Sequence, residues 1–192
     1  MTLRDLSLVE TRKIDLLNAA GELLAQKPTA SLAEIAEYAG IGKATLHRYF
    51  ASREDLMVAL AQRALMVIRD AIVRSELERG SAVDAFTRMI EMLMPLGDKV
   101  FLLLNDNGLQ DHPELADIEA PLTELVVGLI QRGQASGELR ADLNAEWIAR
   151  YLDYALFAAW KAVHDGSIAR NDAARLLVTT LLGGIATRRA TS

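Results

Sequence analysis

The feature that most constrains the fold is the stretch from Ser31 to Phe50, where two short helical patterns meet at Gly-Ile-Gly. Ser31 followed by Glu34 forms the S-x-x-E pattern of a capping box, which predicts a helix beginning there. Gly40 fits the left-handed position at which such a helix stops. Leu46 and Phe50, spaced i, i+4, predict a second short helix with both side chains turned inward. The stretch therefore predicts two short helices joined by a tight turn.

Helical spacing continues along the rest of the chain. A first helix stops at Pro28, and a fourth runs from residue 53 to about Glu78, with Ser52 as its N-cap. Five more helices are predicted over residues 81–94, 98–106, 114–135, 145–165 and 170–188. No segment shows the sustained alternation of a strand or an internal repeat. We predict an all-α protein of about nine helices, with an N-terminal three-helix domain (1–52) joined through the long fourth helix to a C-terminal helical bundle (53–192).

Composition excludes several classes of protein. The chain has no Cys, which excludes a disulfide framework, a thiolate nucleophile and a Cys-based zinc site. Its apolar runs fall short of the roughly 18 residues that a membrane span needs, and the N-terminus has no apolar signal core. His112 and His164 stand far apart beside acids, which is typical of capping or exposed histidines rather than metal ligands. We expect a soluble cytoplasmic protein without a metal, a cofactor or a membrane partner.

The net charge of −5 hides a division along the chain. Residues 1–64 carry eight basic and eight acidic side chains, whereas the remainder carries 13 basic and 18 acidic ones. Between Glu37 and Glu54 there is no acid, while Lys43, Arg48 and Arg53 are basic. Such a local positive region on an acidic protein suits a small surface that binds nucleic acid.

Three interpretations of residues 40–50 compete. A phosphate-binding loop would need Gly in place of Glu37 and Ser or Thr in place of Ala44, and it should follow a strand. A helical hairpin with a solvated basic face is the plainest alternative. A helix-turn-helix is the third, in which the first helix crosses the phosphates and presents the second to the major groove.

The sorting of side chains favours the helix-turn-helix. With Leu46 and Phe50 inward, the second helix exposes Lys43, Ala44 and His47. Ala44 is small enough for close approach to DNA, and the other two can reach bases or phosphates. Ser31, at the start of the preceding helix, adds free N–H groups that suit a phosphate, and Arg53 adds a charge near the start of the fourth helix.

The segment SLAEIAEYAGIGKATLHRYFASREDLMVALAQ resembles the DNA-binding domain of the TetR (tetracycline-repressor-like) family of transcriptional regulators. The shared motifs are the I-A-x-x-A-G core, the G-[IV]-x-x-x-T-L-x-x-[YH]-F recognition helix and a following [SK]-[RK]-E-x-L. The resemblance spans about fifty residues. It implies a ligand-responsive regulator of transcription, in most members a repressor, with DNA binding in residues 1–52 and effector binding and dimerisation in residues 53–192. The alternative is a helical ligand-binding protein or enzyme whose helix-turn-helix is only structural.

The resemblance also implies roles for single residues. Backbone phosphates would be bound by Ser31, Lys43, Thr45 and Tyr49, with Arg53 as a clamp, and the bases would lie nearest Gly42, Ala44 and His47. Two of these positions depart from the family pattern. Gly42 stands where many members have Ser, and His47 replaces the usual Tyr, so that its contact with DNA should depend on pH. Arg48 either turns toward the core or stays exposed.

A homodimer is expected because specific binding generally uses two half-sites about 34–36 Å apart. Small residues recur at helical spacing in the last two helices, and the resemblance implies that these helices form the interface. They are Ala155, Ala158, Ala159, Ala162, Leu176, Thr180 and Gly184. The alternative is that Ala is simply a good helix former in a monomeric core.

The family resemblance further implies an effector pocket inside the bundle. Its candidate residues are apolar or aromatic side chains of the central helices with one amide: Met66, Phe86, Met89, Leu93, Phe101, Leu104, Asn105 and Tyr151. The alternative is that these side chains fill an ordinary core. The flexible Met side chains would suit an apolar small molecule of varied shape. Trp147 and Trp160 are expected to anchor an interface or the core.

Overall fold

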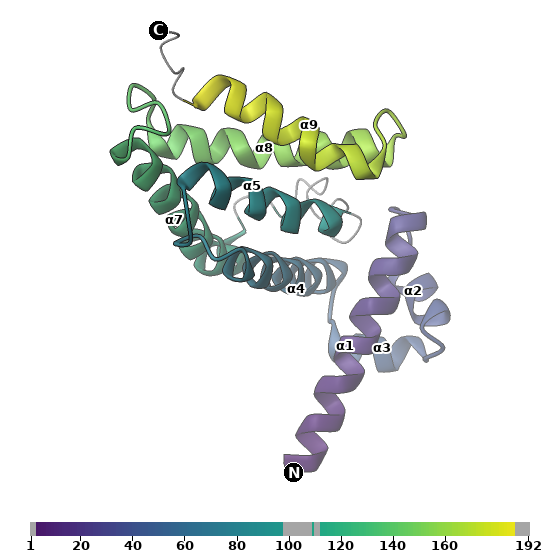
Figure 1. The fold of residues 1–192 in the computed structure, drawn as a ribbon. Coiled ribbons are helices and arrows are strands. Elements are labelled where there is room, and N and C mark those ends of the chain that lie inside the picture. The colour runs from purple at the N-terminus through teal and green to yellow at the C-terminus, as the bar shows by residue number, and fades with distance from the viewer. Residues whose placement is uncertain (1–2, 98–108, 110–111, 187–192) are drawn as a thin grey trace, which may run out of the picture. The chain divides into compact units, whose positions relative to one another are not determined.

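The computed structural model describes residues 3–97, 109 and 112–186, with side chains from Thr11 onward. Within these residues the regular elements are helices, apart from one bridge pair between Leu139 and Ala186. Figure 1 shows their arrangement in two compact units. The predicted all-α architecture is confirmed, and the helix predicted over residues 98–106 lies outside the described part.

The first unit holds the two short helices predicted from the Gly-Ile-Gly turn. It contains α1 (Leu3–Gln26), α2 (Leu32–Tyr38), α3 (Lys43–Tyr49) and the first part of α4 (Arg53–Arg74), together with described residues 109 and 112–115. Helix α2 contacts both α1 and α3. The side chains that join these helices are almost fully buried: Leu24, Ala30, Ile35, Leu46, Phe50 and Leu56.

The second unit is built around α5. It contains the second part of α4, α5 (Ala82–Leu93), the 3-10 helix η1 (Met94–Leu96), most of α7 (Pro113–Ala135), α8 (Ala145–His164) and α9 (Arg170–Ile185). Helices α8 and α9 lie side by side, and α5 contacts α9 (Figure 1). Phe86, Met89 and Ile90 are fully buried on α5. Burial of each such side chain stabilises the unit by about 1.5–3 kcal/mol.

Helix α4 belongs to both units, because the division by contacts falls after Ala64. Its first part, where Leu56 is fully buried, belongs to the unit of α1–α3, and its second part to the unit of α5 and most of α7. The assignment of DNA binding to residues 1–52 and of effector binding and dimerisation to residues 53–192 stays a prediction.

The predicted end of the fourth helix near Glu78 is wrong, since α4 ends at Arg74. Glu76 has left-handed φ (49°) and takes the chain out of the helix. Two arginines from other helices bind the carbonyl groups of the following loop. Arg88 donates to the carbonyls of Ser75, Glu76 and Arg79, and Arg132 to those of Leu77 and Gly80. These bonds replace the helical partners that the carbonyls would otherwise need.

Helix α7 approaches its neighbours most tightly at Gly133. A Cβ at this position would lie 2.7 Å from the Leu139 side chain and 2.9 Å from the Ala82 Cβ, whereas a Cβ at Gly128 of the same helix would meet nothing within 4 Å. Only the former glycine is therefore required for packing.

We expect Gly133→Ala to lower the free energy of unfolding by about 1–3 kcal/mol through overpacking. The matched Gly128→Ala variant should raise it by up to about 1 kcal/mol, because Ala favours the helix over Gly. Thermal unfolding followed by circular dichroism measures both changes. A stabilisation of equal size in the two variants would contradict the packing described at Gly133.

Candidate nucleic-acid interface

The turn between α2 and α3 closes by two backbone hydrogen bonds. The Ile41 N–H donates to the Ala36 carbonyl (2.9 Å) and the Gly40 N–H to the Glu37 carbonyl (3.0 Å). This is the Schellman arrangement, which needs a left-handed residue after the helix. Gly40, with φ of 67°, supplies it, so the predicted stop at this glycine is confirmed. Gly42 is the N-cap of α3 and contributes no side-chain cap.

Helix α3 has one buried side and one exposed side. Leu46 and Phe50 are buried as predicted (0% and 1% exposed). Lys43, Ala44 and His47 are exposed, as their spacing from the buried pair predicts. The His47 Nδ1 lies 3.3 Å from the Ala51 carbonyl oxygen.

The remaining side chains of α3 border the exposed side. Thr45 and Tyr49 are half-buried. Arg48 is exposed, so of the two arrangements considered for it the structure has the outward one. Its guanidinium stands 5.7 Å from the centre of the Tyr49 ring, within range of a cation–π contact. Helix α3 with its cap thus brings together six of the eight residues predicted to bind DNA, and their contacts with DNA stay a prediction.

Ser31 is differently engaged, because Glu34 uses its donors. Both the N–H and the hydroxyl of Ser31 donate to Glu34 Oε2 at 2.8 Å, which completes the predicted capping box. Lys27 donates to the other oxygen of the same carboxylate. The hydrogen bonds from Lys27 and Ser31 lower the pKa of Glu34 from the usual 4.5 to about 2. A phosphate could use Ser31 only after displacing this carboxylate, a competition that the S-x-x-E spacing already implies.

Arg53 ties the loop between α1 and α2 to the start of α4. Its guanidinium donates to the carbonyl of Pro28 at 2.8 Å and to that of Ala30. Both terminal nitrogens are therefore used in the fold, and the predicted phosphate clamp would have to share them. These carbonyls lie more than twenty residues before Arg53 in the chain, so the local sequence could not predict the hydrogen bonds.

The five residues predicted for an effector pocket that lie in the described part of the chain differ in burial. Phe86, Met89 and Leu93 are buried in the core around α5, which fits the alternative of an ordinary core for these three. Met66 and Tyr151 are exposed (49% and 46%). Phe101, Leu104 and Asn105 lie outside the described residues. Their role in effector binding stays a prediction.

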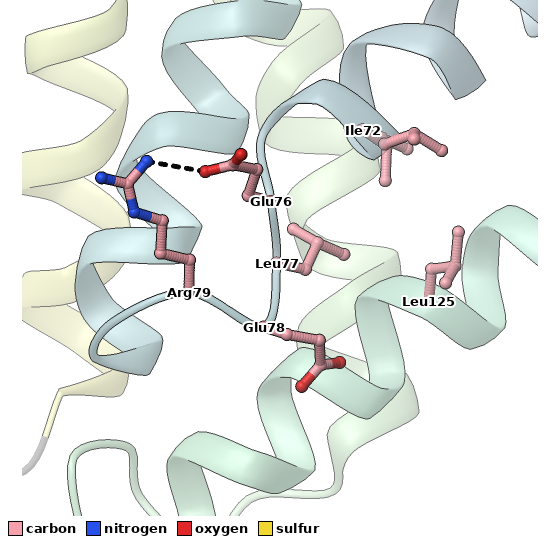
Figure 2. Close-up of a pocket in the computed structure, with 7 residues that line it drawn as sticks. Ile72, Glu76, Leu77, Glu78, Arg79 and Leu125 are labelled. Atoms are coloured by element: carbon pink, nitrogen blue, oxygen red, sulfur yellow. Dashed lines mark hydrogen bonds and ion pairs between the residues drawn. The ribbon is translucent and has the colours of Figure 1, made fainter.

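A hollow of about 690 Å³ opens elsewhere in the second unit, between the end of α4, the loop after it and α7. Figure 2 shows its lining, with Leu77 on the loop and Leu125 on α7, and Glu76 paired with Arg79 (2.8 Å). Ile72 and Val73 add apolar surface, and Glu78 adds a carboxylate. Because most of the lining comes from the loop that Arg88 and Arg132 hold, helical periodicity gave no signal for it.

An aromatic stripe lies exposed on α8. Trp147, Tyr151 and Tyr154 stand at i, i+4 and i+7, and the first and last are 61% and 67% exposed. Of the small residues predicted at an interface, Ala158, Leu176, Thr180 and Gly184 are exposed, and Ala155, Ala159 and Ala162 are half-buried. Trp160 is instead buried, and its Nε1 donates to the Met94 carbonyl (3.2 Å). The i, i+4, i+7 spacing of these aromatic residues is visible in the sequence, but the interface prediction rested on small residues and did not include them.

Within residues 3–97, 109 and 112–186, no group of three His, Cys, Asp or Glu side chains could hold a metal ion. No helix in this part of the chain is long and apolar enough to cross a membrane. His112 Nδ1 accepts from the Glu114 N–H (3.3 Å), a capping role as predicted, and its Nε2 lies 3.8 Å from Glu54.

Comparison with known proteins agrees with this geometry. Residues 16–60 match the sequence profile of a family described as bacterial regulatory proteins, tetR family. The HTH-type transcriptional repressor LfrR of Mycolicibacterium smegmatis is 33% identical over 172 residues, which cover 90% of this chain and 89% of the relative. The HTH-type transcriptional regulator NfxB of Pseudomonas aeruginosa is 30% identical over 172 residues, which cover 88% and 91%.

A solved structure is similar over almost the whole chain. The crystal structure of the TetR-like regulator LfrR from Mycobacterium smegmatis in complex with proflavine superposes with a TM-score of 0.77 at 30% identity. The match covers 94% of this chain and 99% of the other. Both curated relatives are transcriptional regulators, and neither is described as an enzyme.

The capping box should make stability depend on pH through Glu34. Because folding lowers the pKa of Glu34 from 4.5 to about 2, its contribution is present above the unfolded value and is lost as pH falls through that interval. We therefore expect Glu34→Gln to destabilise the protein at neutral pH and to differ progressively less from wild type as the pH falls toward 2. Urea unfolding at a series of pH values measures this. The control is Glu37→Gln, an exposed acid of the same helix outside the capping box, and an identical pH profile for both variants would contradict the assignment.

Proposed function

The chain belongs to the tetR family of bacterial regulatory proteins, and we propose that it represses transcription as a homodimer bound to a near-palindromic operator until a small molecule releases it. It is a DNA-binding transcriptional regulator that responds to a ligand. The observation that carries the proposal is the exposed side of α3, which is free of acids and follows a turn closed by two backbone hydrogen bonds.

The dimensions and chemistry of α3 suit the major groove of DNA. That groove is about 12 Å wide and admits an α-helix. Lys43 supplies a cation for phosphates, Ala44 permits close approach, and His47 supplies a polar group for base edges. Since Leu46 and Phe50 are buried, the helix cannot turn these three side chains away from the surface without exposing its anchors. Phosphate contacts would then set the register of the protein, and base contacts its sequence preference.

The homodimer is proposed to form through α8 and α9. Trp147, Tyr151 and Tyr154 expose aromatic area on α8, and Leu176 is exposed on α9 beside the small residues Thr180 and Gly184. Aromatic residues are enriched at the centres of protein interfaces, and small ones let helices approach closely. A dimer would also supply the second recognition helix that a palindromic site requires.

The effector is proposed to be a small, largely apolar molecule bound by the second unit. The support for a small molecule is the structure of LfrR, a relative 30% identical, in complex with proflavine. A ligand can shift a conformational equilibrium only by its different affinities for the two states. We propose α4 as the element that carries this shift, since its first part belongs to the DNA-binding unit and its second part to the ligand-binding unit.

The DNA-binding proposal is tested with duplexes that the wild-type protein enriches from a random-sequence pool. Lys43→Ala should weaken binding by about tenfold per subunit at about 0.1 M salt, and the slope of log K against log salt should become shallower by about 1 per subunit. Both follow from the loss of one phosphate contact in each subunit, and gel-shift titrations over a range of salt concentrations measure them.

The matched control for that experiment is Arg69→Ala, which removes one exposed cation from the second part of α4. Its affinity and salt slope should equal those of the wild type. If Lys43→Ala and Arg69→Ala bind alike, or if no sequence is enriched by the wild type, the assignment of α3 as the recognition helix is wrong.

The dimer is tested with Tyr154→Lys, which places a charge on the most exposed residue of the aromatic stripe, at its C-terminal end. We expect this variant to sediment as a monomer and to lose cooperative binding to a two-half-site duplex, because a buried unpaired charge is costly at an interface. Val73→Lys is the control, since Val73 is exposed to a similar extent (63%) on a different helix of the same unit. Monomers for both variants, or dimers for both, would show that the stripe is not the interface.

A further inference from the structure

The imidazole of His47 is held in one orientation by the backbone that follows α3. Its Nδ1 lies 3.3 Å from the carbonyl oxygen of Ala51, four residues along the chain. A carbonyl oxygen can only accept a hydrogen bond, so the proton of this contact must be on Nδ1. The turn after α3 therefore selects the tautomer of an exposed side chain on the proposed DNA-binding surface.

The other ring nitrogen is then left with a defined chemistry. When the imidazole is neutral and Nδ1 carries the proton, Nε2 has a free lone pair and acts as a hydrogen-bond acceptor. No described residue bonds to Nε2, and His47 is exposed beside Lys43 and Ala44. Protonation adds a hydrogen to Nε2 and converts it from an acceptor into a donor, while the bond to Ala51 is kept.

The titratable groups near this imidazole include charges of both signs. They lie within one turn of His47 or Ala51 along the chain, and they are Lys43, Arg48 and Tyr49 on α3 and Arg53, Glu54 and Asp55 at the start of α4. Five of them have partners of their own. The guanidinium of Arg48 stands 5.7 Å from the centre of the Tyr49 ring. Asp55 Oδ2 accepts from Ser52, Arg53 donates to the carbonyls of Pro28 and Ala30, and Glu54 lies near His112.

We propose that His47 determines sequence specificity through Nε2, accepting a hydrogen bond from the exocyclic amine of cytosine when neutral and donating one to guanine when protonated. This inference rests on the proposed function, because it takes α3 to lie in the major groove. There cytosine presents an amino donor and guanine the N7 and O6 acceptors, whereas adenine presents both an amino donor and the N7 acceptor and is not discriminated in this way. One base position of each half-site is therefore read in opposite senses at the two protonation states.

The expected preference follows from the worth of one hydrogen bond. A single bond at a base edge should discriminate roughly three- to tenfold per half-site. If the base presents a donor to protonated Nε2, two donors face each other and no hydrogen bond forms. If it presents an acceptor to neutral Nε2, two acceptors face each other. Preference at this position therefore inverts with pH instead of merely weakening, which separates base reading from a general loss of positive charge.

The experiment is selection of duplexes from a random-sequence pool at about pH 8 and about pH 5.5, the range over which histidine changes charge. Wild-type protein is compared with His47→Gln, whose amide does not titrate. We expect one symmetrically related position to change from cytosine at the higher pH to guanine at the lower pH in the wild type only. Affinities of purified duplexes differing at that base pair then measure the fold-change.

The outcomes separate this inference from the function on which it rests. An enriched palindrome with no pH-dependent position, or a pH-dependent position that persists in His47→Gln, would overturn the role of His47 and leave the regulator assignment standing. Failure to enrich any sequence at either pH would overturn the regulator assignment itself.

The tautomer can be measured without DNA. Two-dimensional 15N–1H NMR correlations of the full chain at about pH 8 distinguish a proton on Nδ1 from one on Nε2. We expect the Nδ1–H form for His47. The Nε2–H form would remove the basis of the inference, because Nε2 would then be a donor at both protonation states.

Discussion

The burial of Leu46 and Phe50 against the other helices of the first unit is the interaction on which the rest of this structure depends. Helix α3 is only seven residues long and would not be stable alone, since isolated helices of that length are marginal in water. Its position comes from these two anchors and from the left-handed Gly40 that sets its entry. Once the two anchors and the turn at Gly40 are in place, they determine which side chains of α3 face outward. Those side chains are the polar and charged groups that DNA can contact.

Much of the remaining order comes from arginines that satisfy backbone carbonyls. Arg53 holds the loop before α2, and Arg88 and Arg132 hold the loop after α4. Buried or crowded carbonyls need such partners, and a guanidinium can serve several at once. The positive charge of this acidic chain is thus divided between two uses. Lys43 stays outward on α3, whereas these three arginines are used within the fold.

Sequence reasoning was most successful where the determinants are local. The capping box from Ser31 to Glu34, the stop at Gly40 and the inward pair on α3 each depend on residues within five positions of one another. The end of α4 could not be placed in the same way, because it is fixed by Arg132, more than fifty residues further on. The same limit applies to the exposed stripe on α8, since periodicity identifies a face of a helix and not which neighbour covers it.

The central claim is that the outward side of α3 lies against DNA while Leu46 and Phe50 stay in the core. The most direct measurement is chemical-shift mapping of the 15N-labelled protein titrated with a duplex that it enriches, compared with a scrambled duplex. The account predicts that the largest amide shifts specific to the enriched duplex fall at Gly42–Tyr49, with smaller changes in α5, α8 and α9. Specific binding that leaves Gly42–Tyr49 unshifted would contradict it.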